Sequence, residues 1–365
     1  MKKPEITIVV VPRERFYFAR ESLESLYENT KFPFDLIYVD NNSPAKLKGY
    51  LENQAKEKGF QLIQSDYYLC PNQARNIGLR QVKSKYVVFV DNDVVFSPGW
   101  LEGIYNCAEA TQATVVGPLV CQHQPLHEII HCAGGEYLPA EEYARFISDR
   151  SEVPLQKIDS EGKWQIKEKI YRQTERLSEL ENKLDRCFQT AFIEFHCILV
   201  RTDFFEKYGL LDEGLSCTKE YLDLAMTVTK AGGTIYLEPK SIVTFLSHPP
   251  APPLQLSDMV YFMIRWSDAW ELASLKHFAK KWNLVENEYF KRRYRRLGWR
   301  RKKEIIQPLS RKLSFGFDNP FLTNLLIKID RQINRFLTDR HAKIVADRDR
   351  EQIKRSIVDF PLLEN

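Results

Sequence analysis

The first hundred residues alternate short apolar runs with helix-like segments, and this alternation most limits the folds open to the chain. Runs rich in Val and Ile predict buried parallel strands, and helix-like segments between them act as crossovers. We therefore predict an α/β fold with a mostly parallel sheet and helices on both faces. The predicted strands cover 5–11, 35–40, 60–66 and 85–93, and the predicted helices cover 20–30, 46–59 and 72–84.

Strand and helix signals continue to about residue 245, and the proline-rich "HPPAPP" at 248–253 then marks a boundary. We predict a first domain at 1–247 with a helical insertion at about 140–190, including a helix over 165–188. A mainly helical C-terminal extension follows at 248–365. The apolar stripe expected for its last helix is Leu322, Leu325, Ile329, Ile333, Phe336 and Ile344.

Cysteine usage and hydropathy limit the compartment. The seven cysteines of this 365-residue chain form no Cys-x-x-Cys pair, which favours reduced thiols over a disulfide framework or a zinc site. No run approaches the roughly 20 apolar residues of a membrane span. We therefore expect a cytoplasmic protein that could touch the inner face of a membrane from that side.

Carboxylates end two of the predicted strands. Asp40 ends the second, and Asp91 and Asp93 end the fourth in "KYVVFVDNDVVF". On such sheets ligands bind beyond the carboxyl ends of the strands. Two carboxylates separated by one residue suit Mg²⁺ or Mn²⁺, which borrow oxygens from a diphosphate. The alternative is a strand-ending turn, where Asp and Asn are common.

The neighbouring sequence favours the metal interpretation. The helix "ARNIGL" (residues 74–79) precedes the apolar strand that ends in Asp-Asn-Asp, and this order resembles the core signature of family-2 glycosyltransferases, which have the Rossmann-like GT-A fold. The segments "LIYVDNNSP", "IIHCAGGEY", "ILVRTDFFEKYGLLDEG" and "EYLDLAMTVTKAGGTIYLEP" are similar to other family segments in the same order. The resemblance covers roughly residues 5–245.

Carried over by position, the resemblance implies a nucleotide-sugar site. Asp40 would contact the nucleotide base, Arg75 would line the nucleotide pocket, and Asp91 would approach the ribose. Asp93, with Asp91, would hold the Mn²⁺ or Mg²⁺ that bridges the diphosphate.

Two further residues are candidates for this site. The first strand departs from the family pattern in "VVVPRERF", which leaves Arg13 available for the nucleotide. His248 follows a strand where some GT-A enzymes place a third metal ligand. The alternative for His248 is a loop residue before two prolines.

The catalytic base is expected at the start of the helix "KEYLDLAMTVTK". The family has an acidic pair there; Glu220 matches its first member and Tyr221 replaces the second. We favour Glu220 as general base, with Asp223 as second candidate; the alternative for Glu220 is an acid that stabilises the helix dipole. Further on, Arg265 and Asp268 stand three residues apart on a predicted helix, where they would form an ion pair unless Arg265 reaches a phosphate.

Residues 291–303, "KRRYRRLGWRRKK", contain nine Lys or Arg and no acid. Such a run forms a solvated helical face by default. A contact with an anionic membrane or an anionic acceptor also fits, because aromatic residues lie among the cations, and we prefer these roles to nucleic-acid binding.

The predicted function is a metal-dependent, inverting glycosyltransferase that moves a sugar from a nucleotide-diphosphate donor to a hydroxyl of a saccharide or lipid-linked acceptor. The alternative is a non-catalytic descendant that binds a nucleotide sugar or a glycan, as Tyr221 in the catalytic pair suggests. A nucleotidyltransferase ranks last, because "PRERFYF" contains no glycine-rich phosphate loop.

Overall fold

The structure is a computed structural model that describes residues 3–13, 15–139, 164, 166–180, 183–247 and 252–358. Its strands are β1 Ile6–Val11, β2 Asp35–Asn41, β3 Gln61–Ser65, β4 Tyr86–Asp91, β5 Val94–Phe96, β6 Val115–Gln122, β7 Ile130–Cys132, β8 Gly135–Pro139, β9 Ile166–Ile170, β10 Phe188–Gln189, β11 Cys197–Arg201 and β12 Ile235–Phe245.

Most helices that the structure describes flank these strands or follow them. Those of the first part are η1 Phe16–Phe18, α1 Ala19–Asn29, α2 Ala45–Lys58, α3 Pro71–Leu79, α4 Trp100–Thr111, η2 Leu177–Glu179, α6 Thr202–Tyr208 and α7 Glu220–Lys230. Those of the C-terminal part are α8 Leu256–Arg265, α9 Asp268–Lys281, α10 Glu288–Tyr294, α11 Trp299–Arg301, η3 Lys302–Ile306, α12 Gln307–Leu313 and α13 Pro320–Val358.

One mixed sheet forms the centre of the molecule. Its path runs β10-β12-β6-β11-β4-β1-β2-β3, with β5 on β12 and β7 on β6, and β8 and β9 form a separate hairpin. Strands β3, β2, β1 and β4 pair in parallel, as do β6 and β12, whereas β11 runs antiparallel between them. The predicted strand and helix order of the first hundred residues is therefore correct.

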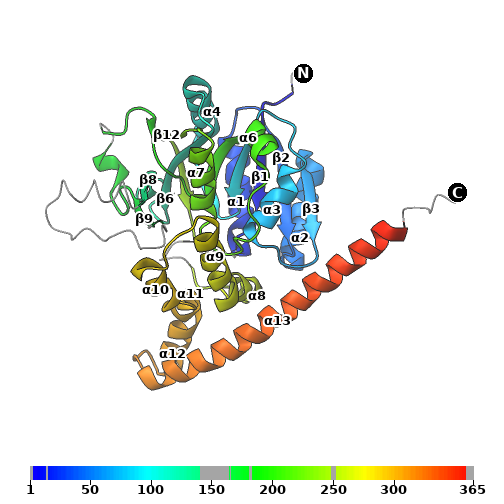
Figure 1. The fold of residues 1–365 in the computed structure, drawn as a ribbon, viewed down its shortest axis with the longest axis vertical. Coiled ribbons are helices and arrows are strands. Elements are labelled where there is room, and N and C mark those ends of the chain that lie inside the picture. Colours follow the sequence, from blue (N-terminus) through cyan, green and yellow to red (C-terminus); the bar gives the residue numbers. More distant parts are fainter. Residues whose placement is uncertain are drawn as a thin grey trace.

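The centre of the sheet is buried on both faces because β1 and β4 are apolar at nearly every position. In β1, Val9 and Val11 belong to one core cluster, which includes residues of α3, α6 and α7. Ile8 and Val10 belong to the other, which includes residues of α1, α2 and α4. Figure 1 shows these helices on the two sides of the sheet. Together with the helical C-terminal part, this arrangement confirms the predicted fold class.

The last helix, α13, buries a polar face, whereas its apolar stripe would be expected to face the rest of the molecule. Figure 1 shows α13 as a long rod below the sheet domain, beyond α8 and α9. The side chains buried along α13 are the polar Asp330, Asn334, Thr338 and His341, and most of the predicted apolar stripe is exposed. Polar partners explain this orientation: the Asn334 side-chain amide donates to the Met263 carbonyl at 2.7 Å, and His341 Nε2 lies 2.7 Å from the Tyr68 carbonyl.

The predicted helix over 165–188 is wrong. Residues Ile166–Ile170 form β9, which pairs antiparallel with β8, and η2 is a single short turn. Arg172 and Thr174 have positive φ values of 55° and 71°, a conformation that ends regular helix for non-glycine residues. The apolar residues Leu180 and Leu184 still pack inward, against Leu119 and Ile130 of the sheet, so the stripe was real but not helical. The rest of the predicted insertion, 140–163, lies outside the described residues.

Two further features concern membrane-spanning helices and the cysteines. Among the helices that it describes, none combines the length and apolar content needed to cross a lipid bilayer. All seven cysteines are free, and all but the partly exposed Cys187 are buried.

Gly78 of the "ARNIGL" segment offers a test of the helix–sheet contact. An alanine Cβ at Gly78 would lie 2.4 Å from Val9 Cγ1, which forces stiff, buried groups apart, so we expect Gly78→Ala to lower the free energy of unfolding by about 1–3 kcal/mol. At Gly49, in the middle of α2, the same Cβ meets nothing within 4 Å, so Gly49→Ala should raise stability by up to about 1 kcal/mol. Urea unfolding measures both; equal effects of the two variants would contradict this account of Gly78.

Candidate active site

A cavity of about 360 Å³ lies beyond the carboxyl ends of β1 and β4, between the sheet and the C-terminal helices. The sheet side contributes Arg13, Arg75 and Asp91, and the C-terminal helices contribute Arg265, Arg300 and Lys303. Its lining Lys and Arg residues outnumber its Asp and Glu residues. The size suits a small ligand, and the charge favours an anionic one.

Asp91 is the central carboxylate of the sheet side. It ends β4 and is 2% exposed. Arg13 Nη1 donates to Asp91 Oδ2 at 2.9 Å, and Arg75 Nη2 donates to Asp91 Oδ1 at 3.1 Å. His196 Nδ1 lies 3.3 Å from Asp91 Oδ2. Burial alone would raise the pKa of Asp91, but the hydrogen bond with His196 and the charges of Arg13 and Arg75 hold it well below its usual range.

The other two strand-ending aspartates lie near this cavity but do not line it. Asp40 is fully buried, accepts a hydrogen bond from the Ser43 backbone N–H at 3.2 Å, and has a pKa raised by burial. Asp93 is also fully buried, and its Oδ2 accepts a hydrogen bond from the Ser247 hydroxyl at 2.5 Å. The structure thus brings Arg13, Arg75 and Asp91 together and leaves Asp40 and Asp93 behind the lining.

This placement bears on the expected divalent cation. Both oxygens of Asp91 already accept hydrogen bonds from guanidinium groups, and Asp93 does not reach the cavity lining. Asp91 and Asp93 therefore do not both face the cavity, and their ligation of a divalent cation stays a prediction. His248 lies outside the described residues.

Glu220 faces the cavity from the opposite side. It is the first residue of α7 and is 8% exposed. Its Oε1 lies 3.7 Å from Arg265 Nη2, and its buried Oε2 has no hydrogen-bond partner among the described residues. Such a carboxylate oxygen is available to accept a proton.

Asp223, one turn further along α7, does not line the cavity. Its oxygens accept hydrogen bonds from Trp282 Nε1 at 2.7 Å and Lys281 Nζ at 2.8 Å. Burial raises the pKa of Asp223 even though Lys281 lowers it. These contacts make it a link between α7 and α9.

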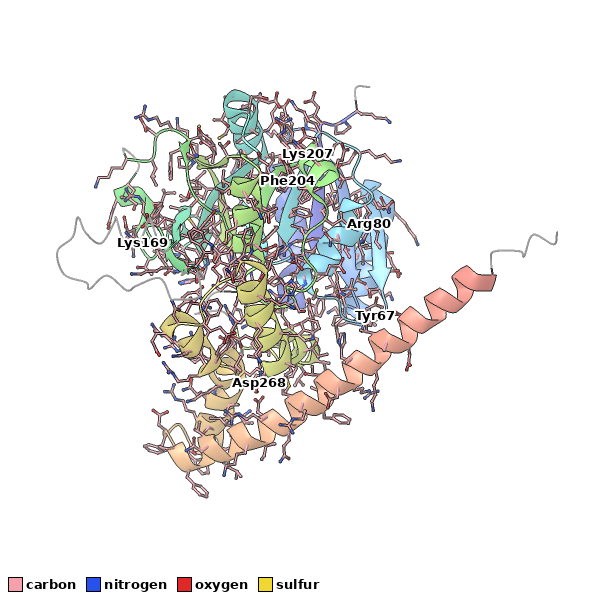
Figure 2. All side chains as sticks on the ribbon, viewed as in Figure 1. Tyr67, Arg80, Lys169, Phe204, Lys207 and Asp268 are labelled. Atoms are coloured by element: carbon pink, nitrogen blue, oxygen red, sulfur yellow. The ribbon has the colours of Figure 1, made fainter. Side chains whose placement is uncertain are left out.

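The predicted ion pair between Arg265 and Asp268 is wrong. The helix breaks between them, since α8 ends at Arg265 and Ser267 caps the start of α9. Arg265 lines the cavity near Glu220, and Asp268 instead pairs with Arg301 at 2.9 Å. Figure 2 shows Asp268 among the C-terminal helices, beside α13.

The basic segment 291–303 is only partly a solvent-exposed patch. Arg293, Arg300 and Lys303 line the cavity. Arg301 is 1% exposed and donates to Asp330 of α13 and to the Trp266 carbonyl. Several of its cations therefore serve the cavity or the packing of α13.

Glu168 is a site residue that sequence analysis missed. It lies on β9 and accepts hydrogen bonds from Lys219 (2.8 Å), Tyr221 (2.5 Å), Tyr289 (2.9 Å) and Arg293 (2.5 Å). Tyr221 stands at the position where the family has its second acid. Its hydroxyl binds the carboxylate of Glu168, which β9 supplies. Sequence analysis missed Glu168 because it predicted a helix over 165–188, whereas Glu168 reaches the cavity only as part of the strand β9.

His131, Glu194 and His196 form a second group that sequence analysis missed. All three line the cavity, and His131 Nε2 lies 2.9 Å from Glu194 Oε2. His131 stands in the family-like segment "IIHCAGGEY", and Glu194 and His196 come just before the family-like segment "ILVRTDFFEKYGLLDEG". The only signal was a polar residue inside an apolar run.

The Glu168 cluster gives a pH-dependent prediction. Burial would raise the pKa of Glu168, but the charges of Lys219 and Arg293 outweigh it and lower the pKa from 4.5 to about 2. The carboxylate therefore contributes roughly 3 kcal/mol of stability above pH 4.5 that is lost as the pH falls through 2. We expect Glu168→Gln to lower the free energy of unfolding by about that amount at pH 7, and by progressively less below pH 4.5.

Denaturant unfolding at pH 7, 4 and 3 measures this difference. The matched control is Glu288→Gln on α10, whose exposed pair with Arg295 should contribute under about 1 kcal/mol. A Glu168→Gln effect that stayed constant from pH 7 to pH 3 would show that packing rather than charge explains it.

The sequence of this chain matches known glycosyltransferases. Residues 7–131 match the model of the glycosyl transferase family 2. The chain is 21% identical over 299 residues to polypeptide N-acetylgalactosaminyltransferase 18 of Homo sapiens, covering 78% of this chain and 45% of that protein. It is 24% identical over 102 residues to an uncharacterized glycosyltransferase of Rickettsia bellii (strain RML369-C), covering 28% and 15%. The chain therefore spans less than half the length of these curated relatives.

Solved structures with partial similarity include GalNAc-T7 with UDP, GalNAc and Mn²⁺, at 14% identity and a TM-score of 0.47, covering 82% of this chain and 58% of that one. Another is the mannosyltransferase PcManGT from Pyrobaculum calidifontis with GDP-Man and Mn²⁺, at 14% identity and a TM-score of 0.46, covering 95% and 86%. The family match of residues 7–131 confirms the predicted resemblance.

Proposed function

We propose that this chain transfers a sugar from a nucleoside-diphosphate sugar to a hydroxyl of a saccharide or lipid-linked acceptor, with inversion at the anomeric carbon. One observation carries the proposal: a cavity at the carboxyl ends of the strands sets the Arg13–Asp91–Arg75 cluster opposite the carboxylate of Glu220. The match of residues 7–131 to family 2 supports the same chemistry.

The donor would lie on the sheet side of the cavity. Asp91 can accept hydrogen bonds from the ribose, and the guanidinium groups of Arg13 and Arg75 stand where a diphosphate would be held. Asp40, which ends β2 two strands away from β4 in the sheet, would contact the nucleotide base. As the bond between the anomeric carbon and the diphosphate breaks, the electron pair moves to the diphosphate oxygen, whose charge these arginines stabilise.

Glu220 would act as the general base. Its Oε2 accepts the proton of the acceptor hydroxyl while the acceptor oxygen bonds to the anomeric carbon. A single displacement of this kind inverts the configuration. Arg265 Nη2 lies 3.7 Å from Glu220 Oε1, and Asp223 is the less favoured base because Lys281 and Trp282 hold it away from the cavity.

The acceptor would lie against the C-terminal helices. There Arg300 stacks on the Trp266 ring at 4.0 Å, and Lys303 lies 5.2 Å from the centre of the Trp299 ring. Aromatic faces beside cations suit a sugar that carries a phosphate or carboxylate. An anionic saccharide or a lipid-linked sugar phosphate fits this wall.

A bound Mn²⁺ or Mg²⁺ would neutralise the departing diphosphate. Ligation by Asp93 and Asp91, with His248, stays a prediction, and no step above depends on it. The binding-only alternative also remains testable, since it requires a nucleotide site without turnover.

Glu220→Gln tests the base. The amide keeps the shape but cannot take a proton, so we expect kcat to fall by about 10²–10⁴-fold while the Kd for the nucleoside diphosphate stays within about threefold. The measurement is product release from a panel of nucleotide sugars, with calorimetry for nucleotide binding.

Asp223→Asn is the matched control on the same helix. We expect it to lower the melting temperature but to change kcat by less than about tenfold, because Asp223 does not touch the cavity. A large loss of kcat in Asp223→Asn with none in Glu220→Gln would reverse the assignment. Nucleotide binding without turnover in the wild-type chain would favour the binding-only alternative.

We also propose that the chain contacts an anionic membrane surface through α13 rather than through 291–303. Between residues 320 and 348 the helix carries twice as many Lys and Arg as Asp and Glu, so the exposed face fits anionic headgroups better than a second copy of itself. The apolar side chains that it exposes are Phe321 (82%), Leu325 (46%), Ile329 (44%), Ile333 (46%), Phe336 (64%) and Ile344 (40%). The predicted cytoplasmic location stays a prediction.

Co-sedimentation with vesicles tests this contact. The wild-type chain should sediment with phosphatidylglycerol vesicles and not with phosphatidylcholine vesicles, and Phe321→Ser/Phe336→Ser should weaken binding at least about tenfold. Leu256→Ser, which removes another exposed apolar side chain, is the control and should bind normally. Absence of vesicle binding, or a dimer that the double variant dissolves, would overturn the proposal.

A further inference from the structure

We propose that His131, Glu194 and His196 form a binding site for a divalent transition-metal ion, separate from the Asp-Asn-Asp carboxylates. This inference deepens the proposed function, on which it rests for the role of the ion, because the site opens into the same cavity. Two imidazoles and one carboxylate are a recurrent ligand set for such ions.

The three side chains are already gathered around one point. One ligand atom of each lies within 4.8 Å of the others. Glu194 Oε2 is 2.9 Å from His131 Nε2 and 3.6 Å from His196 Nε2. They come from β7 and from the segment before β11, so the sheet holds them in place.

The outer ring nitrogens have the partners that metal-ligating histidines need. His131 Nδ1 lies 3.1 Å from Gln122 Oε1, and His196 Nδ1 lies 3.3 Å from Asp91 Oδ2. Both oxygens are acceptors and can hold the rings in the Nδ1–H tautomer. Arg13 Nη1, a donor, also lies 3.0 Å from His196 Nδ1, so ion binding through His196 Nε2 requires that Asp91 rather than Arg13 be the Nδ1 partner. In that tautomer both Nε2 lone pairs are directed to Glu194.

In the Nδ1–H tautomer this arrangement requires a proton or a cation between the imidazole rings and Glu194. An Nε2 lone pair 2.9 Å from a carboxylate oxygen is repulsive unless a proton or a cation lies between them. A cation bound to all three groups satisfies each of them at once.

The ligand set also indicates the kind of ion. Imidazole favours Zn²⁺ and similar transition-metal ions over Mg²⁺, which prefers oxygen, and the carboxylate of Glu194 also suits Mn²⁺. Three protein ligands leave at least one position open, and all three residues line the cavity. An oxygen of the donor diphosphate, held beside Arg13, could fill that position.

Calorimetric titration of the metal-free full chain with Zn²⁺ and with Mn²⁺ tests the site without any donor. We expect one ion per chain, with Mg²⁺ unable to displace it at equal concentration. Glu194→Gln and His131→Ala should each weaken binding by about 100-fold or more, and Gln122→Leu, which removes only the outer partner, by about 10-fold. Melting curves confirm that each variant is folded, and Glu194→Gln keeps the shape of the cluster.

Two variants serve as controls. Asp93→Asn and His277→Ala, which removes a histidine outside the cavity that pairs with Asp212, should bind within about threefold of wild type. Saturable binding abolished by Asp93→Asn but kept in Glu194→Gln and His131→Ala would move the ion to the Asp-Asn-Asp carboxylates and overturn the proposal. Absence of saturable binding in the wild-type chain would show that His131 and Glu194 form an ion pair only. Ion binding without transferase activity would leave this inference standing and reject the proposed function alone.

Discussion

The buried carboxylate of Asp91 is the interaction on which the site depends. An unpaired charge at this depth would cost several kcal/mol, so the fold must bring cations to it. Arg13 comes from the loop after β1, and Arg75 comes from α3. The "ARNIGL" segment therefore has a physical purpose at three positions: Arg75 pairs with Asp91, Asn76 exchanges two hydrogen bonds with the Leu211 backbone, and Gly78 lets α3 touch β1.

Glu168 has a similar effect on the other side of the cavity. It draws Lys219 and Tyr221, at the start of α7, and Tyr289 and Arg293, on α10, onto one carboxylate of β9. This arrangement costs free energy at Lys219. Its backbone is in a left-handed conformation with φ of 75°, and burial of its side chain lowers the pKa of the ammonium group to about 8. Tyr221 replaces the family's second acid, but its hydrogen bond to Glu168 still brings a carboxylate to the residue next to Glu220.

The parts of the fold that local pattern governs could be predicted from the sequence. The first four strands, the helices between them and the strand-ending aspartates follow from apolar runs and turn residues. What could not be predicted depends on long-range contact. β9 pairs with a strand about thirty residues away, and His131 meets Glu194 only in the folded sheet. Arg265 and Asp268 do not pair with each other because α8 ends at Arg265 and Ser267 caps the start of a new helix, α9.

The wall of the cavity that the C-terminal helices form is held together by α13. Arg301 stands between the cavity residues Arg300 and Lys303 in sequence, and its guanidinium is held by Asp330 of α13. One turn further, Asn334 holds the end of α8, next to Arg265. Because these polar anchors need the body-facing side of α13, its apolar side chains are left facing outward. The same helix therefore supports the wall that we propose binds the acceptor and presents the surface that we propose meets the membrane, so both proposals depend on how this helix packs.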